Sequence, residues 1–392
     1  MMTTPYHISN TPELLMGCGS AHNLYELTDR YKGPVLMITG GSTWENLRFF
    51  PGFLDQLKST NRLAGLVRIN HEPSPDDIDE AVKIYQEKEV GCIVSIGGGS
   101  VIDAGKAISA MLKSEGSVKD YLEGIGNRVP TGRKVPFIAL PTTAGTGSEA
   151  TQNAVISEQG PEGFKKSLRH MNYVPNMAVV DPELTVSCPP ETTAASGMDS
   201  FTQLVESYLS TRANPFTDAL AFDAIGRIYG SLELAYRDGR NIPARSEIAY
   251  AATISGITLA NAGLGVVHGF AQPLGSFFGI PHGVVCGTLM AATNRVTVKK
   301  LVNEGLSDTI AFKKYVGIGK LFSDAHTKND AYYLDFCIHE LDRLTSELQL
   351  PLLSDYGVSE KHFDEIVAFT GLKYHPIKLD EEDLKEILGQ RL

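Results

Sequence analysis

Short apolar runs alternate with segments of helical periodicity over the first half of the chain. Val35–Thr39 is the clearest such run, and its lack of polar alternation is typical of a strand buried on both faces. The expected strands are Val35–Thr39, Leu63–Asn70, 91–97, Phe137–Leu140 and Met177–Val180. The expected helices are 43–60, 77–88 and 101–113, the second of them capped by Asp76. Strands that alternate with helices predict βαβ units and a parallel, Rossmann-like sheet.

The pattern changes in the second half of the chain. Residues 153–169 still predict a two-stranded hairpin, with 159–163 as its turn. From Pro189 onward the apolar positions follow helical spacing almost throughout, with Gly/Pro breaks at 273–283 and 351–357. We therefore expect two domains, an α/β domain over 1–182 and an all-helical domain over 183–392.

Composition and charge narrow the kind of ligand. The 392 residues are 42% apolar and 21% charged, which provides enough apolar material for two cores. The formal net charge of −11 argues against nucleic acid and anionic membranes as partners, because both attract clustered Lys and Arg, and it favours a small molecule. Five widely spaced cysteines without a CxxC pair indicate reduced thiols. With no secretory leader and no run of about 20 apolar residues, we expect a cytoplasmic protein.

A glycine-rich turn joins the strand at 91–97 to the helix that follows. Gly97, Gly98 and Gly99 lack Cβ atoms, so the backbone can approach a ligand closely. The unpaired N–H groups and the dipole at the start of the next helix favour an anion. The turn is therefore a candidate phosphate cradle, and the alternative is a tight turn with no ligand.

A second polar loop follows the strand at 137–140. Pro141–Glu149 contains three threonines (Thr142, Thr143 and Thr146), a serine and two glycines, a composition suited to lining a polar ligand. The alternative is a Gly/Thr turn with capping side chains. Because the carboxyl ends of parallel strands share one edge of a sheet, we expect this loop beside the glycine turn.

A polar stripe occupies one face of the helix predicted after Gly197. Asp199, Gln203, Glu206 and Ser210 are spaced by four, three and four residues. Such a stripe is ordinarily a solvated helix face. The alternative is that Asp199 and Gln203, one turn apart, are a pair of ligands.

Two histidines stand in apolar surroundings further along the chain. His268 follows Val-Val and His282 lies between proline and glycine, fourteen residues later. A histidine in such a setting is more often a hydrogen-bonded core residue than a ligand. Two of them around a Pro/Gly break favour convergence on one point, and with Asp199 they would suit Zn²⁺, Fe²⁺, Ni²⁺ or Mn²⁺.

The sequence resembles the iron-containing (group III) alcohol dehydrogenases over nearly its whole length. The motifs that carry the resemblance are Gly97–Asp103 with Gly105-Lys106, Pro141–Glu149, Thr193–Asp199, His268-Gly269 and Pro281–Gly283. The resemblance implies a dehydroquinate synthase-like architecture, with an N-terminal dinucleotide-binding α/β domain, a C-terminal helical domain and the active site in the cleft between them. It also implies one divalent metal and nicotinamide-dependent interconversion of an alcohol and an aldehyde or ketone.

The resemblance also implies roles for particular residues. The dinucleotide would be bound by Gly40, Gly41, Ser42, Gly97, Gly98, Gly99, Ser100, Asp103, Thr142, Thr143, Thr146 and Lys166, with Asp103 at the nicotinamide end and Lys166 near a ribose. The metal ligands would be Asp199, Gln203, His268 and His282. The catalytic residues would be Asp199, His268, His282 and Gln272.

The sequence departs from the family pattern at three places. Gln203 and Gln272 stand where the family usually has histidine. An amide oxygen is a weaker metal donor than imidazole, so for Gln203 we expect weaker metal retention, with either Fe²⁺ or Zn²⁺ as the metal. Gln272 cannot titrate near neutral pH, so the proton of the alcohol must leave through water, the cofactor ribose or another residue. After the first strand, Thr39-Gly40-Gly41-Ser42 lacks the Asp that would repel a 2′-phosphate, which favours NADP(H) over NAD(H).

The expected reaction is direct hydride transfer between the cofactor and the carbinol carbon, with the metal as Lewis acid. Simple alkanols, diols, lactaldehyde-like hydroxyaldehydes and sugar-acid primary alcohols are all open as substrates, and a homodimer or larger homo-oligomer is expected from the family. One rival is a metal-independent reductase of an acidic substrate, similar to the maleylacetate reductases. A remoter rival is a non-catalytic nucleotide-binding protein.

Overall fold

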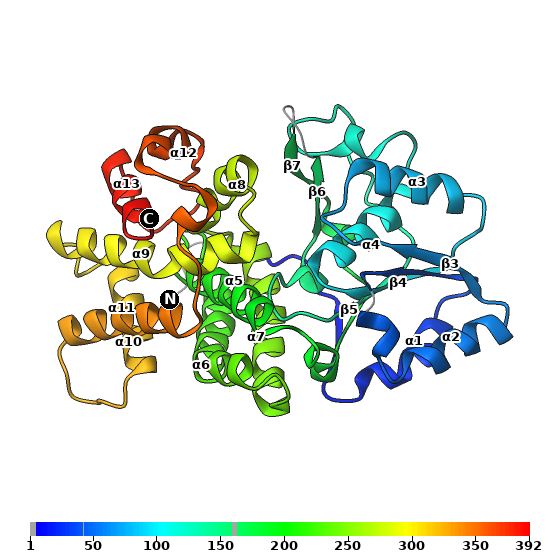
Figure 1. The fold of residues 1–392 in the computed structure, drawn as a ribbon, viewed down its shortest axis with the longest axis horizontal. Coiled ribbons are helices and arrows are strands. Elements are labelled where there is room, and N and C mark those ends of the chain that lie inside the picture. The colour runs from blue at the N-terminus through cyan, green and yellow to red at the C-terminus, as the bar shows by residue number, and fades with distance from the viewer. Residues whose placement is uncertain (1–4, 42, 159–162) are drawn as a thin grey trace. The chain divides into compact units, whose positions relative to one another are not determined.

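The computed structural model describes residues 5–41, 43–158 and 163–392 and divides into two compact units. One unit is Ile8–Cys188, and the other is Pro189–Leu392 with the described residues that precede Ile8. Figure 1 labels the helices and strands of both. Each unit has its own hydrophobic core, so each is described by itself.

The first unit is an α/β domain built on a six-stranded sheet (Figure 1). Its strands are β1 (Glu13–Met16), β2 (Val35–Thr39), β3 (Leu63–Arg68), β4 (Cys92–Gly97), β5 (Phe137–Pro141) and β8 (Met177–Val180). Their order is β1-β8-β5-β4-β2-β3, and every neighbouring pair is parallel. The predicted parallel Rossmann-like sheet is confirmed.

Helices cover both faces of this sheet. The helices are α1 (Leu24–Asp29), α2 (Phe50–Ser59), α3 (Pro75–Tyr85) and α4 (Gly99–Met111). Successive strand residues point to opposite faces, so Leu36 and Ile38 share a core with α3 and α4. Val35 and Met37 instead pack with residues of α1 and α2. This burial on both faces explains why the central strands read as unbroken apolar runs.

The hairpin predicted at 153–169 is formed by two antiparallel strands. They are β6 (Asn153–Glu158) and β7 (Phe164–Arg169), paired from Asn153 with Arg169 to Glu158 with Phe164. Most of the predicted turn, residues 159–162, lies outside the described residues.

The second unit is helical throughout its described elements, as predicted. Its helices are α5 (Pro190–Leu209), α6 (Pro215–Arg237), α7 (Ile242–Ala262), α8 (Val267–Phe278), α9 (His282–Asn303), α10 (Ile310–Phe322), α11 (Asp330–Glu347), α12 (Phe363–Phe369) and α13 (Glu381–Gly389). Helix α5 packs against α6, α7, α9 and α10. Among the residues that the structure describes, no single helix is both long and apolar enough to cross a membrane.

Several element boundaries differ from the prediction. The helix expected over 43–60 is a short 3-10 turn, Thr43–Asn46, followed by α2 from Phe50. Helix α3 is capped by Ser74 rather than Asp76, because the Ser74 side chain accepts from the backbone N–H of Asp77 and Asp77 caps in return. The break predicted over 273–283 is present but shorter, since Pro273 lies inside α8 and only residues 279–281 separate α8 from α9.

Candidate metal centre and cofactor turn

The polar stripe of α5 is buried, so its interpretation as a solvated face is wrong. Asp199, Gln203 and Glu206 are exposed by only 2%, 3% and 6%, and Ser210 is buried as well. The neighbouring helices enclose α5 on this side as on its apolar side. Buried carboxylates and amides need partners, so the stripe requires polar or charged groups facing it.

Helices α8 and α9 bring such groups to the polar stripe of α5. Helix α8 ends at Gly279, whose φ of 66° lies in the left-handed region that glycine adopts without strain. Helix α9 then starts at His282, and the two helices pack together. His268, near the start of α8, and His282 therefore lie close, with ring centroids 5.3 Å apart.

Both imidazoles point at Asp199. Nε2 of His268 lies 3.3 Å from Oδ1 of Asp199, and Nε2 of His282 lies 3.5 Å from the same oxygen. That oxygen is buried and makes no hydrogen bond of acceptable geometry. The predicted convergence of the two histidines and Asp199 is therefore present in the structure.

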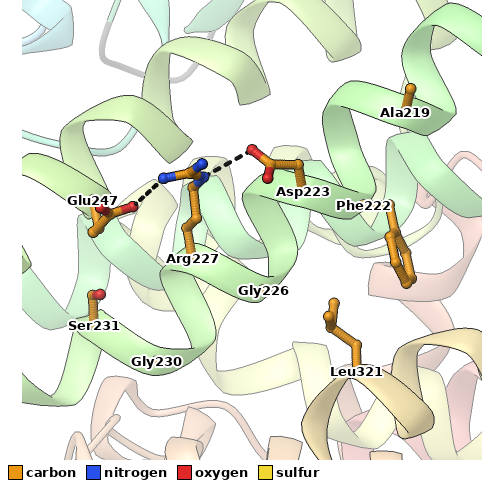
Figure 2. A pocket seen from close by; sticks show the side chains of 9 residues that line it. All are labelled: Ala219, Phe222, Asp223, Gly226, Arg227, Gly230, Ser231, Glu247 and Leu321. Atoms are coloured by element: carbon orange, nitrogen blue, oxygen red, sulfur yellow. Dashed lines mark hydrogen bonds and ion pairs between the residues drawn. The ribbon is translucent and has the colours of Figure 1, made fainter.

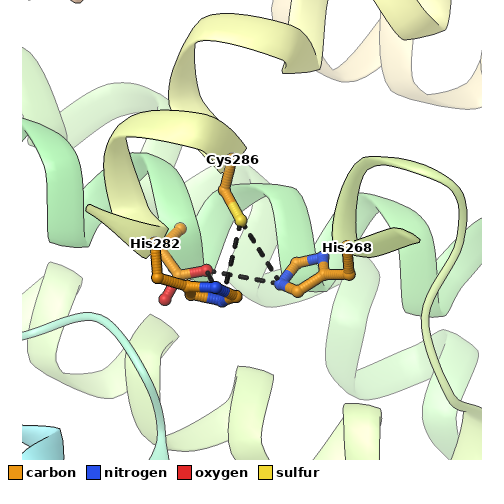
Figure 3. Close-up of side chains that lie close together, drawn as sticks. His268, His282 and Cys286 are labelled. Carbon is orange, nitrogen blue, oxygen red and sulfur yellow. Dashed lines mark hydrogen bonds and ion pairs between the residues drawn. The ribbon is translucent and has the colours of Figure 1, made fainter. Parts of the chain in front are cut away.

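A fourth donor, Cys286, belongs to the same cluster. Its Sγ lies 3.6 Å from Nε2 of His268 and 3.8 Å from Nε2 of His282, as Figure 3 shows. One donor atom each from Asp199, His268, His282 and Cys286 lies within 4.8 Å of all the others. The sequence predicts Cys286 only as a reduced thiol, although its position four residues after His282 places both side chains on one helix face.

Glu206 holds the ring of His268. Its Oε2 lies 2.7 Å from Nδ1 of His268, and its Oε1 accepts from the backbone N–H of Val267 at 2.7 Å. Because an ionised carboxylate can only accept, Nδ1 donates, and Nε2 is left to face the cluster. A carboxylate behind an imidazole is the usual support of a metal-binding histidine.

The glycine turn of the other unit is closed by the threonine loop. β4 and β5 pair up to Gly97 and Pro141, and the N–H of Thr142 donates to the carbonyl of Gly97 at 3.0 Å. A Cβ at Gly99 would come within 2.8 Å of Thr146 Oγ1, and a Cβ at Gly98 would sit 3.4 Å from Thr143 Oγ1. The two loops thus lie side by side at the sheet edge, as predicted, over the start of α4.

Family models match both units. Residues 11–182 match the model of iron-containing alcohol dehydrogenase, and residues 193–392 match that of the Fe-containing alcohol dehydrogenase family, C-terminal. The chain belongs to the iron-containing alcohol dehydrogenase family. It is an oxidoreductase of the alcohol dehydrogenase and aldehyde reductase class.

Individual members of the family show how far the similarity extends. The chain is 36% identical to alcohol dehydrogenase 4 of Schizosaccharomyces pombe over 301 residues, 76% of this chain and 67% of that protein. It is 29% identical to the NADPH-dependent butanol dehydrogenase of Clostridium saccharobutylicum over 96% of this chain and 95% of that protein. A crystal structure of 1,3-propanediol oxidoreductase superposes with a TM-score of 0.85 at 27% identity, covering 99% of this chain and all of that one.

The charged groups of this family member's cluster perturb one another. Burial raises the pKa of Asp199, but the neighbouring imidazoles of His282 and His268 outweigh burial and hold it at about 2. Burial lowers the pKa of His268, yet Cys286, Asp199 and Glu206 together raise it well above its usual value. Burial raises the pKa of the Cys286 thiol to about 12. The cluster is therefore built around the carboxylate charge of Asp199.

The two glutamines among the predicted site residues lie in different surroundings. Gln203 is buried one turn after Asp199, and its Oε1 accepts a hydrogen bond from Ser255 Oγ at 2.7 Å. Gln272 is exposed on α8, one turn after His268. The structure thus places Gln203 beside the cluster with its amide oxygen engaged by α7.

Asp103 and Lys106, in a motif shared with the family, tie α4 to the threonine loop and the hairpin. Asp103 accepts hydrogen bonds from Ser148 Oγ and from the backbone N–H of Val155, and Lys106 pairs with it at 3.2 Å. The buried Lys106 ammonium also donates to Ser148 O and Thr151 Oγ1, at 2.9 Å each. These contacts give Asp103 a structural role. Its expected role at the nicotinamide end of the cofactor stays a prediction.

Gly40, Gly41 and Lys166 of the predicted cofactor set are also among the described residues. A Cβ at Gly40 would come within 3.1 Å of Val101 at the start of α4, whereas Gly41 is exposed and its carbonyl accepts from Trp44 Nε1 at 2.7 Å. Ser42 lies outside the described residues, and Lys166 is half-buried on β7. Their roles in dinucleotide binding remain predictions.

A hollow on the outer side of α6 contains none of the predicted residues. Figure 2 shows its lining: Ala219, Phe222, Asp223, Gly226, Arg227, Gly230, Ser231, Glu247 and Leu321. The Arg227 guanidinium already pairs with Asp223 at 2.8 Å and Glu247 at 2.9 Å. Arg227, the one cationic side chain of this lining, is thus already neutralised by Asp223 and Glu247.

Proposed function

We propose that this enzyme is a nicotinamide-dependent, metal-assisted alcohol dehydrogenase and aldehyde reductase whose divalent metal is held by Asp199, His268 and His282. The observation that carries the proposal is the buried Oδ1 of Asp199, which faces two imidazole Nε2 atoms and has no hydrogen bond. A buried carboxylate oxygen in this state fits a cation between the three side chains. Imidazole and carboxylate donors suit the divalent metals of this family.

A bound divalent metal supplies Lewis acidity toward an alcohol or carbonyl oxygen, and a nicotinamide cofactor accepts or donates the hydride. The chain's residues provide the conditions for this chemistry. Asp199 contributes the negative charge, and Glu206 fixes the ring of His268 so that Nε2 faces inward. The side chain of His282 is 35% exposed, so substrate can reach the cluster from its side.

Replacing Asp199 by Asn tests the metal assignment. The amide keeps the size of the carboxylate but removes its charge, so we expect purified Asp199→Asn protein to contain little metal by elemental analysis. Alcohol oxidation should fall by about 10²–10³-fold, since several kcal/mol of charge stabilisation is lost. Asp335→Asn, an exposed change on α11, should leave both quantities unchanged. Full turnover by metal-free Asp199→Asn would refute the assignment and favour a metal-independent reductase.

We further propose NADP(H) as the preferred cofactor. Strand β2 ends in Thr39 and Gly40 with no acidic residue there, and Arg68 stands opposite Thr39 at the end of β3. The exposed Arg68 guanidinium pairs with Glu45 at 2.9 Å and lies 5.3 Å from the ring centroid of Trp44, so a phosphate would share this guanidinium with Glu45. An arginine beside this strand end suits a ribose 2′-phosphate, and one similar enzyme is named for NADPH dependence.

Arg68 gives this preference a direct test. Arg68→Gln should raise the KM for NADPH about tenfold, because one charge-assisted contact is lost, and should leave the KM for NADH unchanged. Arg30→Gln is a matched control, since Arg30 is exposed and paired with Glu13 on the opposite edge strand. Equal effects on the two cofactors would contradict the proposal.

The substrate is proposed only as a class, a small primary alcohol or its aldehyde. Similar proteins are named for butanol and 1,3-propanediol, so linear alkanols and diols head the panel to be assayed. Hydroxyaldehydes and sugar-acid alcohols complete it. The expected homodimer or larger assembly is checked by light scattering of the same preparation.

A further inference from the structure

We infer that Cys286 is the fourth protein ligand of this metal site, which becomes an Asp, His, His, Cys site suited to Zn²⁺. The inference rests on the proposed metal site and names the donor that completes it. Metal binding would form a bond to Sγ and release the thiol proton to water.

The donor spacings match a tetrahedral site. With bonds of about 2.0–2.1 Å to nitrogen and oxygen and about 2.3 Å to sulfur, tetrahedral ligands lie roughly 3.3–3.4 Å apart for nitrogen and oxygen and about 3.6 Å apart for nitrogen and sulfur. Asp199 Oδ1 lies 3.3 and 3.5 Å from the two imidazole nitrogens. Cys286 Sγ lies 3.6 and 3.8 Å from the same nitrogens. These four of the six ligand–ligand spacings are within about 0.2 Å of a zinc tetrahedron, and all four donor atoms lie within 4.8 Å of one another.

The packing of α9 on α5 delivers the sulfur to this place. A Cβ at Gly283 would lie 2.6 Å from the carbonyl oxygen of Ala195, and a Cβ at Gly287 would lie 2.9 Å from the Cβ of Met198. The two glycines therefore let the helix backbones approach closely over the turn of α5 that precedes Asp199. Cys286 is fully buried between them and faces His268 and His282 (Figure 3).

Gln203 is the competing fourth ligand. Its Oε1 lies 2.7 Å from Ser255 Oγ, whose single hydroxyl proton is shared between Gln203 and the carbonyl of Ala252, also at 2.7 Å. Coordination through Oε1 would have to share or break this hydrogen bond, and a neutral amide is a weaker donor than a thiolate. The sulfur thus replaces, from α9, the donor that α5 lacks at position 203.

Thiolate ligation has a spectroscopic signature that needs no turnover. Metal-free full-length protein, freed of thiol reductants, is loaded with one equivalent of Co²⁺. The wild type should show a sulfur-to-cobalt charge-transfer band in the near ultraviolet, with the intense visible bands of tetrahedral Co²⁺. Cys286→Ser should lose the charge-transfer band while still binding Co²⁺ through the other three side chains.

Two variants serve as controls. Cys337→Ala removes another fully buried thiol of the same unit, on α11, and should retain the band. Gln203→Ala should also retain the charge-transfer band. If the wild type shows no such band and Gln203→Ala no longer binds Co²⁺, Gln203 is the fourth ligand instead.

The possible results separate this inference from the proposed function. Wild-type protein that binds one Co²⁺ per chain without a sulfur band overturns the role of Cys286 and leaves the Asp199 and histidine site standing. Protein that binds no Co²⁺ overturns both. A band that persists in Cys286→Ser but disappears in Cys337→Ala would also overturn the inference, because the sulfur would come from elsewhere.

Discussion

The cofactor turn and the metal cluster are built from the chain in opposite ways. Gly97–Ser100 is one continuous segment from the end of β4 into α4, and the groups that it would offer a phosphate are backbone amides. The metal cluster takes its donors from three helices, with Asp199 on α5, His268 on α8, and His282 and Cys286 on α9. The turn is thus defined by local sequence, whereas the cluster exists only once the helices pack.

This difference predicts which changes damage which region. A side chain of the cluster can be removed without touching the α/β unit, and a glycine of the turn can be changed without touching the helical unit. The experiments below are ordered by the effect that we expect on turnover.

His268→Ala should have the largest effect. It removes a buried donor of the cluster and the partner of Glu206, so bound metal should be lost and kcat/KM should fall about 10²–10³-fold. Dinucleotide affinity, followed by NADPH fluorescence, should stay unchanged. His326→Ala, at an exposed position, is the matched control. An equal loss of dinucleotide affinity would break the comparison.

Glu206→Gln should have a smaller effect on the same region. Glutamine offers one carbonyl oxygen where Glu206 accepts from both His268 and the N–H of Val267, so one of the two donors loses its acceptor. Metal affinity, measured by competition with a chelating dye, should fall about 10- to 100-fold. Glu191→Gln, exposed at the start of the same helix, should not change it. Unchanged metal affinity in Glu206→Gln would contradict the role of Glu206 in supporting His268.

Gly98→Ala tests the other region. Its Cβ would meet Thr143 at an ordinary contact distance of 3.4 Å, so the fold should tolerate the methyl group. A bound pyrophosphate would not, and dinucleotide affinity should fall about tenfold with metal content unchanged. Gly52→Ala in α2, where a Cβ has open space, is the control. Wild-type affinity in Gly98→Ala would contradict the phosphate cradle.

Lys134→Met should leave turnover unchanged and alter only the stability of the α/β unit. Burial and the charge of Lys106 lower the pKa of Lys134 to about 8, and its ammonium donates to the carbonyl of Val174. The unfolded chain holds this proton more tightly, so the free energy of unfolding should rise from about pH 8 to pH 10.5, by up to about 3 kcal/mol. Denaturant titrations across this range should show a flatter profile in Lys134→Met. Parallel profiles would show that the lysine titrates normally in the fold.

Much of the α/β unit was predictable because its signals are local. β8 has the predicted bounds, Met177–Val180, and β4 and β5 differ from prediction by one residue at one end. β1 was missed, since Glu13–Met16 is short and largely exposed and becomes a strand only by pairing with β8. The prediction misplaced the cap of α3 because it treated Pro75 as part of a chain break. Proline is in fact favoured at the first helical position, which makes the preceding Ser74 the cap.

The helical unit was predictable as a class but not as a site. Its periodicity indicated helices, yet the polar face of α5 could not be assigned to solvent or interior until its neighbours were placed. Family resemblance implied Asp199, Gln203, His268 and His282 as ligands. Cys286 escaped notice because the contact depends on how closely α9 approaches α5, which Gly283 and Gly287 determine.

Metal removal tests the central claim most directly. We expect exhaustive chelation of the wild-type enzyme to abolish aldehyde reduction while NADPH still binds, and one equivalent of Zn²⁺ or Fe²⁺ per chain to restore the rate. Such a result would separate the metal cluster from the cofactor turn within one protein. Full turnover by protein that contains no metal by elemental analysis would contradict the claim that Asp199, His268 and His282 hold a catalytic metal.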